Sequence, residues 1–140
     1  MNDFKDIHIG EYIRLRVEET GVEVSRICNF IKCSEKELQE IYTSKSIDSW
    51  ILLRLSKILE YDFFRIYTQH LILYAPPGGG AKALSGKKSN LPQFRKNIYT
   101  KEIIDFILGL IKNGEKTAGQ ITEYYGIPRA TLFKWMAKNP

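Results

Sequence analysis

Residues 76–97 (PPGGGAKALSGKKSNLPQFRKN) interrupt the chain with a segment rich in glycine, proline, serine and lysine. Such a composition offers little apolar surface to a core and predicts a flexible basic linker. The linker would divide the chain into two parts, residues 1–75 and residues 98–140. The second part has only about 40 residues, a size at which a core is marginal unless a dimer partner, the first part or bound DNA supports it.

Two helices are predicted at the start of the second part. Thr100 is placed to cap a helix over residues 101–113, and Gly114 follows as its end. The apolar stripe of this helix consists of Ile103, Ile104, Ile107, Leu108 and Ile111. Residues 117–125 form the second helix, which begins with the capping-box sequence Thr117–Gln120.

A turn and a basic helix end the chain. Gly126 permits the turn, and Pro128 fits the first position of the helix because it fixes φ and has no amide hydrogen. At about 100° per residue, the apolar face of this helix consists of Leu132, Phe133 and Met136, with Trp135 at its edge. The opposite face consists of Ala130, Thr131, Lys134 and Lys138. Small and cationic residues suit close approach to a DNA groove, although an ordinary helix with a solvated basic face has the same pattern.

The first part carries signals for five short helices, over residues 7–19, 23–31, 34–42, 50–59 and 62–69. Gly21 supplies a left-handed end for the first, Ser34–Glu37 is a capping box, and Asp48 or Ser49 caps the fourth. Together these helices predict a compact bundle and an all-α chain. The apolar segment that follows, Leu71–Pro77, fits either a short strand or an arm against another subunit.

Charge is distributed unevenly between the two halves. Residues 1–75 carry 10 Lys and Arg against 12 Asp and Glu, whereas residues 76–140 carry 11 against 4. A basic half points to a polyanionic partner, with nucleic acid as the usual one and an anionic membrane surface as its competitor. No long, strongly basic amphipathic helix and no apolar run near 18 residues supports a membrane partner. The N-terminal sequence lacks a secretory signal, so we expect a cytoplasmic protein.

The chain shows no convincing catalytic or metal-binding constellation. Cys28 and Cys33 lie far in sequence from His8 and His70, and structural zinc usually takes four ligands in two close pairs. We interpret both thiols as reduced, small apolar side chains. Residues 80–89 (GAKALSGKKS) resemble a phosphate-binding loop only superficially, because the glycine spacing and the Ser or Thr position are wrong. We therefore expect no metal, no cofactor, no small-molecule substrate and no enzymatic activity.

The two parts resemble two families of DNA-binding domain. Residues 9–68 resemble the Cro and phage-repressor (Xre-like) helix-turn-helix domain through IGEYIRLRVEETG, VSRICNFIKCSEKELQEIY and KSIDSWILLRLSKILEYDFF. Residues 98–138 resemble the helix-turn-helix of insertion-sequence transposases, particularly the small first-frame proteins, through YTKEIIDFILGLIKNG and GIPRATLFKWMAK. The resemblances imply two small helix-turn-helix bundles, one of five helices and one of three. They also imply DNA contacts at Arg129, Lys134 and Lys138.

The first part departs from its family pattern. Val24 stands where a polar residue is usual, and Lys32 replaces a turn glycine, which predicts a different turn. The exposed face of its recognition helix carries Lys36, Glu37, Gln39 and Glu40, with Glu35 in the first turn. Carboxylates on such a face oppose phosphate contact. The first part is therefore either a second DNA-binding module or a module for dimerisation or partner docking.

We expect a sequence-specific, non-enzymatic protein that binds double-stranded DNA, either a transcriptional regulator or an accessory protein of a mobile element. The helix from Arg129 to Lys138 would enter the major groove. The candidate DNA contacts are Arg129, Ala130, Thr131, Lys134, Lys138 and Thr117, and the weaker candidates are Lys36, Gln39, Lys45, Lys87, Lys88, Arg95 and Lys96. A homodimer would match palindromic sites. The alternative is an interaction adaptor whose acidic first part docks a protein while the basic part adds only non-specific attraction to DNA.

Overall fold

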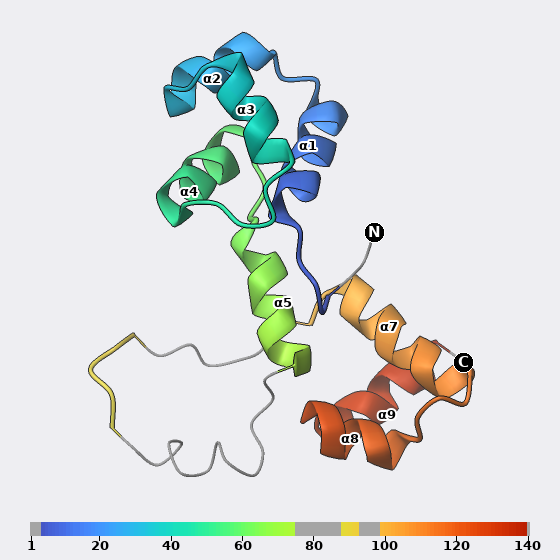
Figure 1. The fold of residues 1–140 in the computed structure, drawn as a ribbon. Helices are drawn as coiled ribbons and strands as arrows, with labels where there is room; N and C mark the ends of the chain where they lie inside the picture. The colour runs from blue at the N-terminus through green and yellow to red at the C-terminus, as the bar shows by residue number, and fades with distance from the viewer. Residues whose placement is uncertain (1–3, 75–87, 93–98, 140) are drawn as a thin grey trace. The chain divides into compact units, whose positions relative to one another are not determined.

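The computed structural model describes residues 4–74, 88–92 and 99–139. In these ranges it has eight α-helices and no strand, which confirms the all-α prediction (Figure 1). The chain divides into two compact units, one of residues 3–68 and the other mainly of residues 69–140. We call them the N-terminal unit and the C-terminal unit. Most of the predicted linker, residues 76–97, lies outside the described residues, so the predicted division at residues 75 and 98 stays a prediction.

The N-terminal unit is a bundle of short helices around one core. Its helices are α1 (Ile9–Thr20), α2 (Val24–Ile31), α3 (Glu35–Tyr42), α4 (Ser49–Ile58) and the first part of α5 (Phe64–Tyr74). Helix α1 packs on α3, and α2 packs on both α3 and α4 (Figure 1). The buried core consists of Ile9, Ile13, Ile27, Cys28, Leu38, Leu52, Leu55, Leu59, Phe63 and Ile66.

Side-chain caps begin two of these helices at the predicted positions. The Ser34 hydroxyl accepts a hydrogen bond from the Glu37 amide, and the Glu37 carboxylate accepts one from the Ser34 amide, each at 3.1 Å. The predicted capping box is therefore confirmed. At α4 the Asp48 carboxylate accepts the amides of Trp50 and Ile51 at 3.0 and 3.2 Å. Asp48, rather than Ser49, is the cap.

The turn between α2 and α3 corrects one prediction. Lys32 adopts the left-handed conformation, with φ of 55° and ψ of 57°, and its amide donates to the Cys28 carbonyl. This is the conformation that a glycine commonly adopts at a helix end. The prediction that Lys32 requires a different turn was wrong, because the lysine takes the left-handed conformation itself despite its Cβ.

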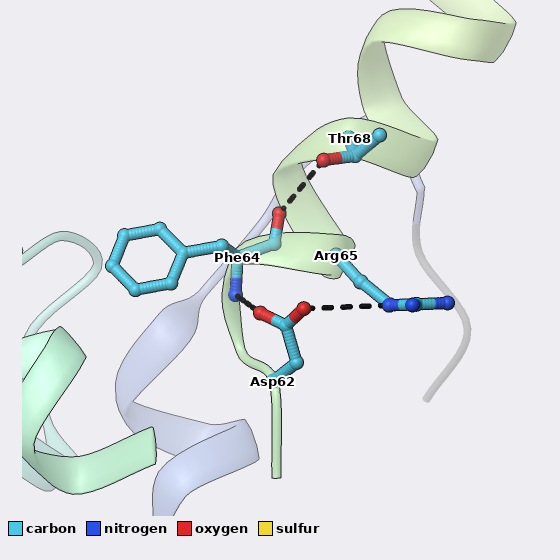
Figure 2. Close-up of polar contacts among 4 residues, drawn as sticks. All are labelled: Asp62, Phe64, Arg65 and Thr68. Atoms are coloured by element: carbon cyan, nitrogen blue, oxygen red, sulfur yellow. Dashed lines mark hydrogen bonds and ion pairs between the residues drawn. The ribbon is translucent and has the colours of Figure 1, made fainter. Parts of the chain in front are cut away.

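Helix α5 begins beside Asp62, as predicted, but ends later than its sequence prediction. Asp62 organises its start, since one carboxylate oxygen accepts the Phe64 amide at 3.1 Å and the other lies 3.3 Å from the Arg65 guanidinium (Figure 2). One turn later the Thr68 hydroxyl donates to the Phe64 carbonyl at 3.2 Å. The helix continues to Tyr74 rather than ending near Gln69. Residues 71–74 are therefore helical and not a strand, while residues 75–77 lie outside the described residues.

The C-terminal unit contains α7 (Lys101–Lys112), α8 (Ala118–Tyr125) and α9 (Arg129–Lys138). Thr100 caps α7 by accepting the Ile103 amide at 3.3 Å, as predicted. Gly114 and Gly126 follow α7 and α8 with φ of 76° and 70°, in the left-handed region that favours glycine. The unit also includes the end of α5. Its buried side chains are Ile72, Leu73, Ile103, Ile107, Ile121, Tyr125, Ile127, Leu132 and Trp135.

Candidate nucleic-acid interface

The turn between α8 and α9 sets the direction of the last helix. Gly126 ends α8 by donating its amide to the Thr122 carbonyl at 3.1 Å. Ile127 is then fully buried, and Pro128 has an extended ψ of 139°. Pro128 is the N-cap of α9 and not its first helical residue, which corrects the prediction. Its carbonyl accepts the first bond of the helix, from Leu132 at 3.0 Å, so proline loses nothing by lacking an amide hydrogen.

Two side chains fix how α9 is rotated about its own axis. Leu132 is fully buried and Trp135 is 9% exposed, and the Trp135 ring meets the Tyr99 ring edge-on at a centroid distance of 5.0 Å. Phe133, predicted to face inward, is 51% exposed. The sequence prediction placed Trp135 at the edge of the apolar face. Periodicity alone could not choose between the two aromatic residues, and contact with Tyr99 selects the tryptophan.

The exposed face of α9 is cationic with one aromatic ring. We call it the α9 surface, and it consists of Arg129, Ala130, Phe133, Lys134, Ala137 and Lys138. Three of these residues are cations, two are alanines and none is a carboxylate. Thr131, also predicted on this face, is only partly exposed. Four candidate contacts therefore lie on one exposed face together with Ala137 and Phe133: Arg129, Ala130, Lys134 and Lys138. The sequence prediction had placed Phe133 on the opposite, apolar face.

Thr117 begins α8 and is engaged locally. Its hydroxyl oxygen accepts the Gln120 amide at 3.2 Å, and the Gln120 side chain accepts the Thr117 amide at 2.8 Å, which confirms the predicted capping box. A threonine hydroxyl is both donor and acceptor. Thr117 can therefore keep the cap and still donate its O–H to a phosphate oxygen.

The exposed face of α3 in the N-terminal unit is predominantly acidic. Glu35, Lys36, Glu37, Gln39 and Glu40 are all exposed. Glu37 is held in the capping box at the start of the helix. This face therefore carries three carboxylates and a single lysine, a balance that disfavours a phosphate backbone.

Two of the remaining weak candidates, Lys45 and Lys88, lie in the described residues. Lys45 forms an ion pair with Asp6, with Nζ 2.6 Å from the carboxylate, and the hydrogen bond and charge of Lys45 lower the pKa of Asp6. Lys88 is exposed. Lys87, Arg95 and Lys96 lie outside the described residues.

A shallow basic hollow in the N-terminal unit was not predicted. It measures about 460 Å³ and is lined by Arg26, Asn29, Phe30, Lys57, Ile58 and Glu60. Beside it, the Arg54 guanidinium lies 4.5 Å from the Phe30 ring centroid and donates to the Phe30 carbonyl at 2.5 Å. Arg26 and Lys57 come from different helices, so no local sequence pattern pairs them. Only the packing of α2 on α4 brings them to one surface.

A second unpredicted feature lies on α8. The Lys116 ammonium sits 4.5 Å from the Tyr124 ring centroid, a cation–π contact, and Tyr124 is 57% exposed. Lys116 lies in the bend just before Thr117, the cap of α8, whereas Gln120 and Tyr124 are four residues apart on one face of the helix. The spacing can be read from the sequence, but it does not distinguish a residue with a binding role from an ordinary surface residue.

The cysteines are both free thiols, with Cys28 buried. Burial raises the pKa of the Cys33 thiol to about 11, with a contribution from its hydrogen bond to Cys28. A thiol with so high a pKa is largely protonated at neutral pH and is a poor nucleophile or metal ligand. Within the described residues no three His, Cys, Asp or Glu side chains gather into a metal-binding group. In the same ranges no helix has the length and apolar character needed to cross a bilayer.

Comparison with known proteins gives no relative for the chain. No protein-family model, no curated protein and no solved structure matches it. The resemblances to Xre-like and transposase helix-turn-helix domains therefore stay predictions.

Proposed function

We propose that this chain is a sequence-specific protein that binds double-stranded DNA, a transcriptional regulator or an accessory protein of a mobile element. In the proposal, α2–α3 and α8–α9 are two helix-turn-helix pairs, and residues 76–97 are a basic linker between them. Helix α9 enters the major groove. Helix α8 crosses the phosphate backbone, with the Thr117 hydroxyl as a phosphate donor.

The α9 surface is the observation that carries this proposal. It presents Arg129, Lys134 and Lys138 beside two alanines, without a carboxylate on the same face. Small residues permit close approach of the helix to the groove floor, and the cations neutralise phosphates or bond to guanine. Buried Leu132 and Trp135 hold the helix in this orientation. In helix-turn-helix proteins the second helix of the pair lies in the major groove, which is the place proposed for α9.

DNA titration of the full chain tests the proposal. We expect the Arg129→Ala, Lys134→Ala double variant to bind duplex DNA more weakly, and the slope of log affinity against log salt to flatten by about 0.9 for each lost phosphate contact. Arg129→Ala alone should reduce discrimination between sites by about 1 to 3 kcal/mol if Arg129 bonds to a guanine. The matched control is the Lys101→Ala, Lys112→Ala double variant, which removes the same charge from exposed positions on α7.

The control separates contact from general attraction. If both double variants weaken binding equally, the basic charge acts non-specifically and α9 is not the recognition helix. If the α9 variant keeps the wild-type affinity and salt slope, the DNA-binding assignment is wrong. The exposed carboxylates of α3 would then favour the alternative, an adaptor whose N-terminal unit docks a partner protein.

A further inference from the structure

Phe133 is the aromatic residue of the otherwise cationic and small α9 surface. Its ring is 51% exposed although the neighbouring Leu132 is fully buried. On a helix the nearest side chains to Phe133 are those three and four residues away, among them Arg129, Ala130 and Ala137. All three are exposed. Because two of these neighbours are alanines, the ring projects above the surface around it.

The charges around the ring indicate which kind of partner it meets. Arg129, Lys134 and Lys138 share the face with Phe133, and no carboxylate lies on it. An apolar protein groove would have to accommodate three cations together with the ring. Duplex DNA offers phosphates for the cations and, in the major groove, one apolar group on the base edges, which is the 5-methyl group of thymine. Charge complementarity therefore favours DNA as the occupant.

We propose that Phe133 is a specificity-determining residue that packs against a thymine 5-methyl group and selects an A·T pair within the binding site. The inference rests on the proposed function, since it requires α9 in the major groove. It assigns the base preference to an apolar contact rather than to a hydrogen bond. Arg129 and Lys134 would supply the phosphate or guanine contacts on either side of the ring.

Removal of single methyl groups from the DNA tests this proposal. A duplex selected from random DNA by the full wild-type chain is prepared in versions with one thymine at a time replaced by deoxyuridine, which lacks only the methyl group. We expect one replacement to weaken wild-type binding about fourfold, the factor expected for one buried methyl group. The Phe133→Ala chain should bind the thymine and deoxyuridine versions equally at that position.

Two further variants make the result specific to this ring. Phe133→Leu retains an apolar side chain and should keep part of the methyl preference. Tyr124→Ala removes another exposed aromatic ring of the C-terminal unit and should keep all of it. Because Phe133 is half-exposed, Phe133→Ala should retain the wild-type circular dichroism spectrum and melting temperature.

Failure of the inference is distinguishable from failure of the proposed function. If affinity depends on Arg129 and Lys134 but no methyl group matters, the DNA-binding function stands and the role of Phe133 is overturned. The role is also overturned if Phe133→Ala weakens binding equally to every thymine and deoxyuridine version, since the ring would then contribute without selecting a base. If the wild-type chain binds no duplex at all, the proposed function itself fails.

Discussion

Two residues of the N-terminal unit, Lys32 and Glu60, have a left-handed backbone conformation, which L-residues rarely adopt. Lys32 ends α2 with φ of 55°, and Glu60 follows α4 with φ of 51°. The left-handed conformation costs about 1–2 kcal/mol for a residue with a Cβ. At Glu60 the cost is offset by the Arg16 guanidinium, which donates to the carbonyls of Leu59 at 3.0 Å and Glu60 at 3.3 Å. The Lys32 side chain is exposed, so replacing it disturbs no core packing.

Lys32→Gly should therefore stabilise the N-terminal unit. Glycine adopts positive φ without the Cβ penalty, so we expect the free energy of unfolding to rise by about 1 kcal/mol, measured by urea denaturation. Lys32→Ala is the matched control, because it removes the same charge but keeps the Cβ, and it should leave the stability nearly unchanged. Equal stabilisation by both variants would assign the effect to charge and contradict the backbone explanation.

Between elements, the start of α1 contacts the segment that follows α3 through backbone atoms. The amides of Ile9 and Gly10 donate to the carbonyls of Lys45 and Ser44 at 3.1 and 3.0 Å. These bonds satisfy two donors that a helix N-terminus leaves without partners inside the helix. The approach is close because residue 10 has no side chain. A Cβ there would lie 2.5 Å from the Tyr42 carbonyl oxygen and 2.7 Å from that of Ser44.

Gly10→Ala should destabilise the N-terminal unit by about 1–3 kcal/mol, the usual cost of overpacking, because carbonyl oxygens of the backbone cannot rotate away as a side chain can. Gly109→Ala on α7 is the control, since an added Cβ there meets nothing within 4 Å. Alanine favours a helix, so the control should be more stable than the wild type by about 0.5–1 kcal/mol. Thermal melts followed by circular dichroism measure both changes, and a stabilising Gly10→Ala would refute the close contact.

In the molecule as a whole, the C-terminal unit has core residues from outside its three helices α7, α8 and α9. Three short helices alone make a marginal core. The same compact unit includes residues 69–74 from the end of α5, where Ile72 and Leu73 are buried. The Tyr74 ring lies edge-on to the Tyr125 ring at a centroid distance of 6.5 Å. The end of α5 thus adds apolar side chains to a unit that the sequence prediction began only at residue 98.

Leu73→Ala should accordingly destabilise the chain strongly. Leu73 is fully buried, and truncation of a buried leucine costs about 2–5 kcal/mol. Leu71→Ala makes the same chemical change on the same helix at a side chain that is 59% exposed, and should cost at most about 0.5 kcal/mol. Chemical denaturation of the two variants compares them directly. Similar losses for both would show that the end of α5 does not contribute a core.

Much of the fold could be predicted because helix signals are local. The capping boxes at Ser34 and Thr117 each involve a side chain and a backbone amide three residues away, so four residues are enough to specify them. The glycines after α1, α7 and α8 mark left-handed turns for an equally local reason. The continuation of α5 to Tyr74 was missed because an isolated apolar segment has no period long enough to separate a helix from a strand.

The candidate site shows the same limit. Local residue patterns are enough to specify the helices, most of their starts and a cationic helix after Gly126, because these properties depend on residues a few positions apart. Tertiary packing selects the aromatic residue of that helix that faces outward. Trp135 packs against Tyr99, which lies 36 positions away in the sequence, and Phe133 is exposed as a result. Rotation of a helix about its axis is set by its packing partners, and those partners are not encoded in the helix itself.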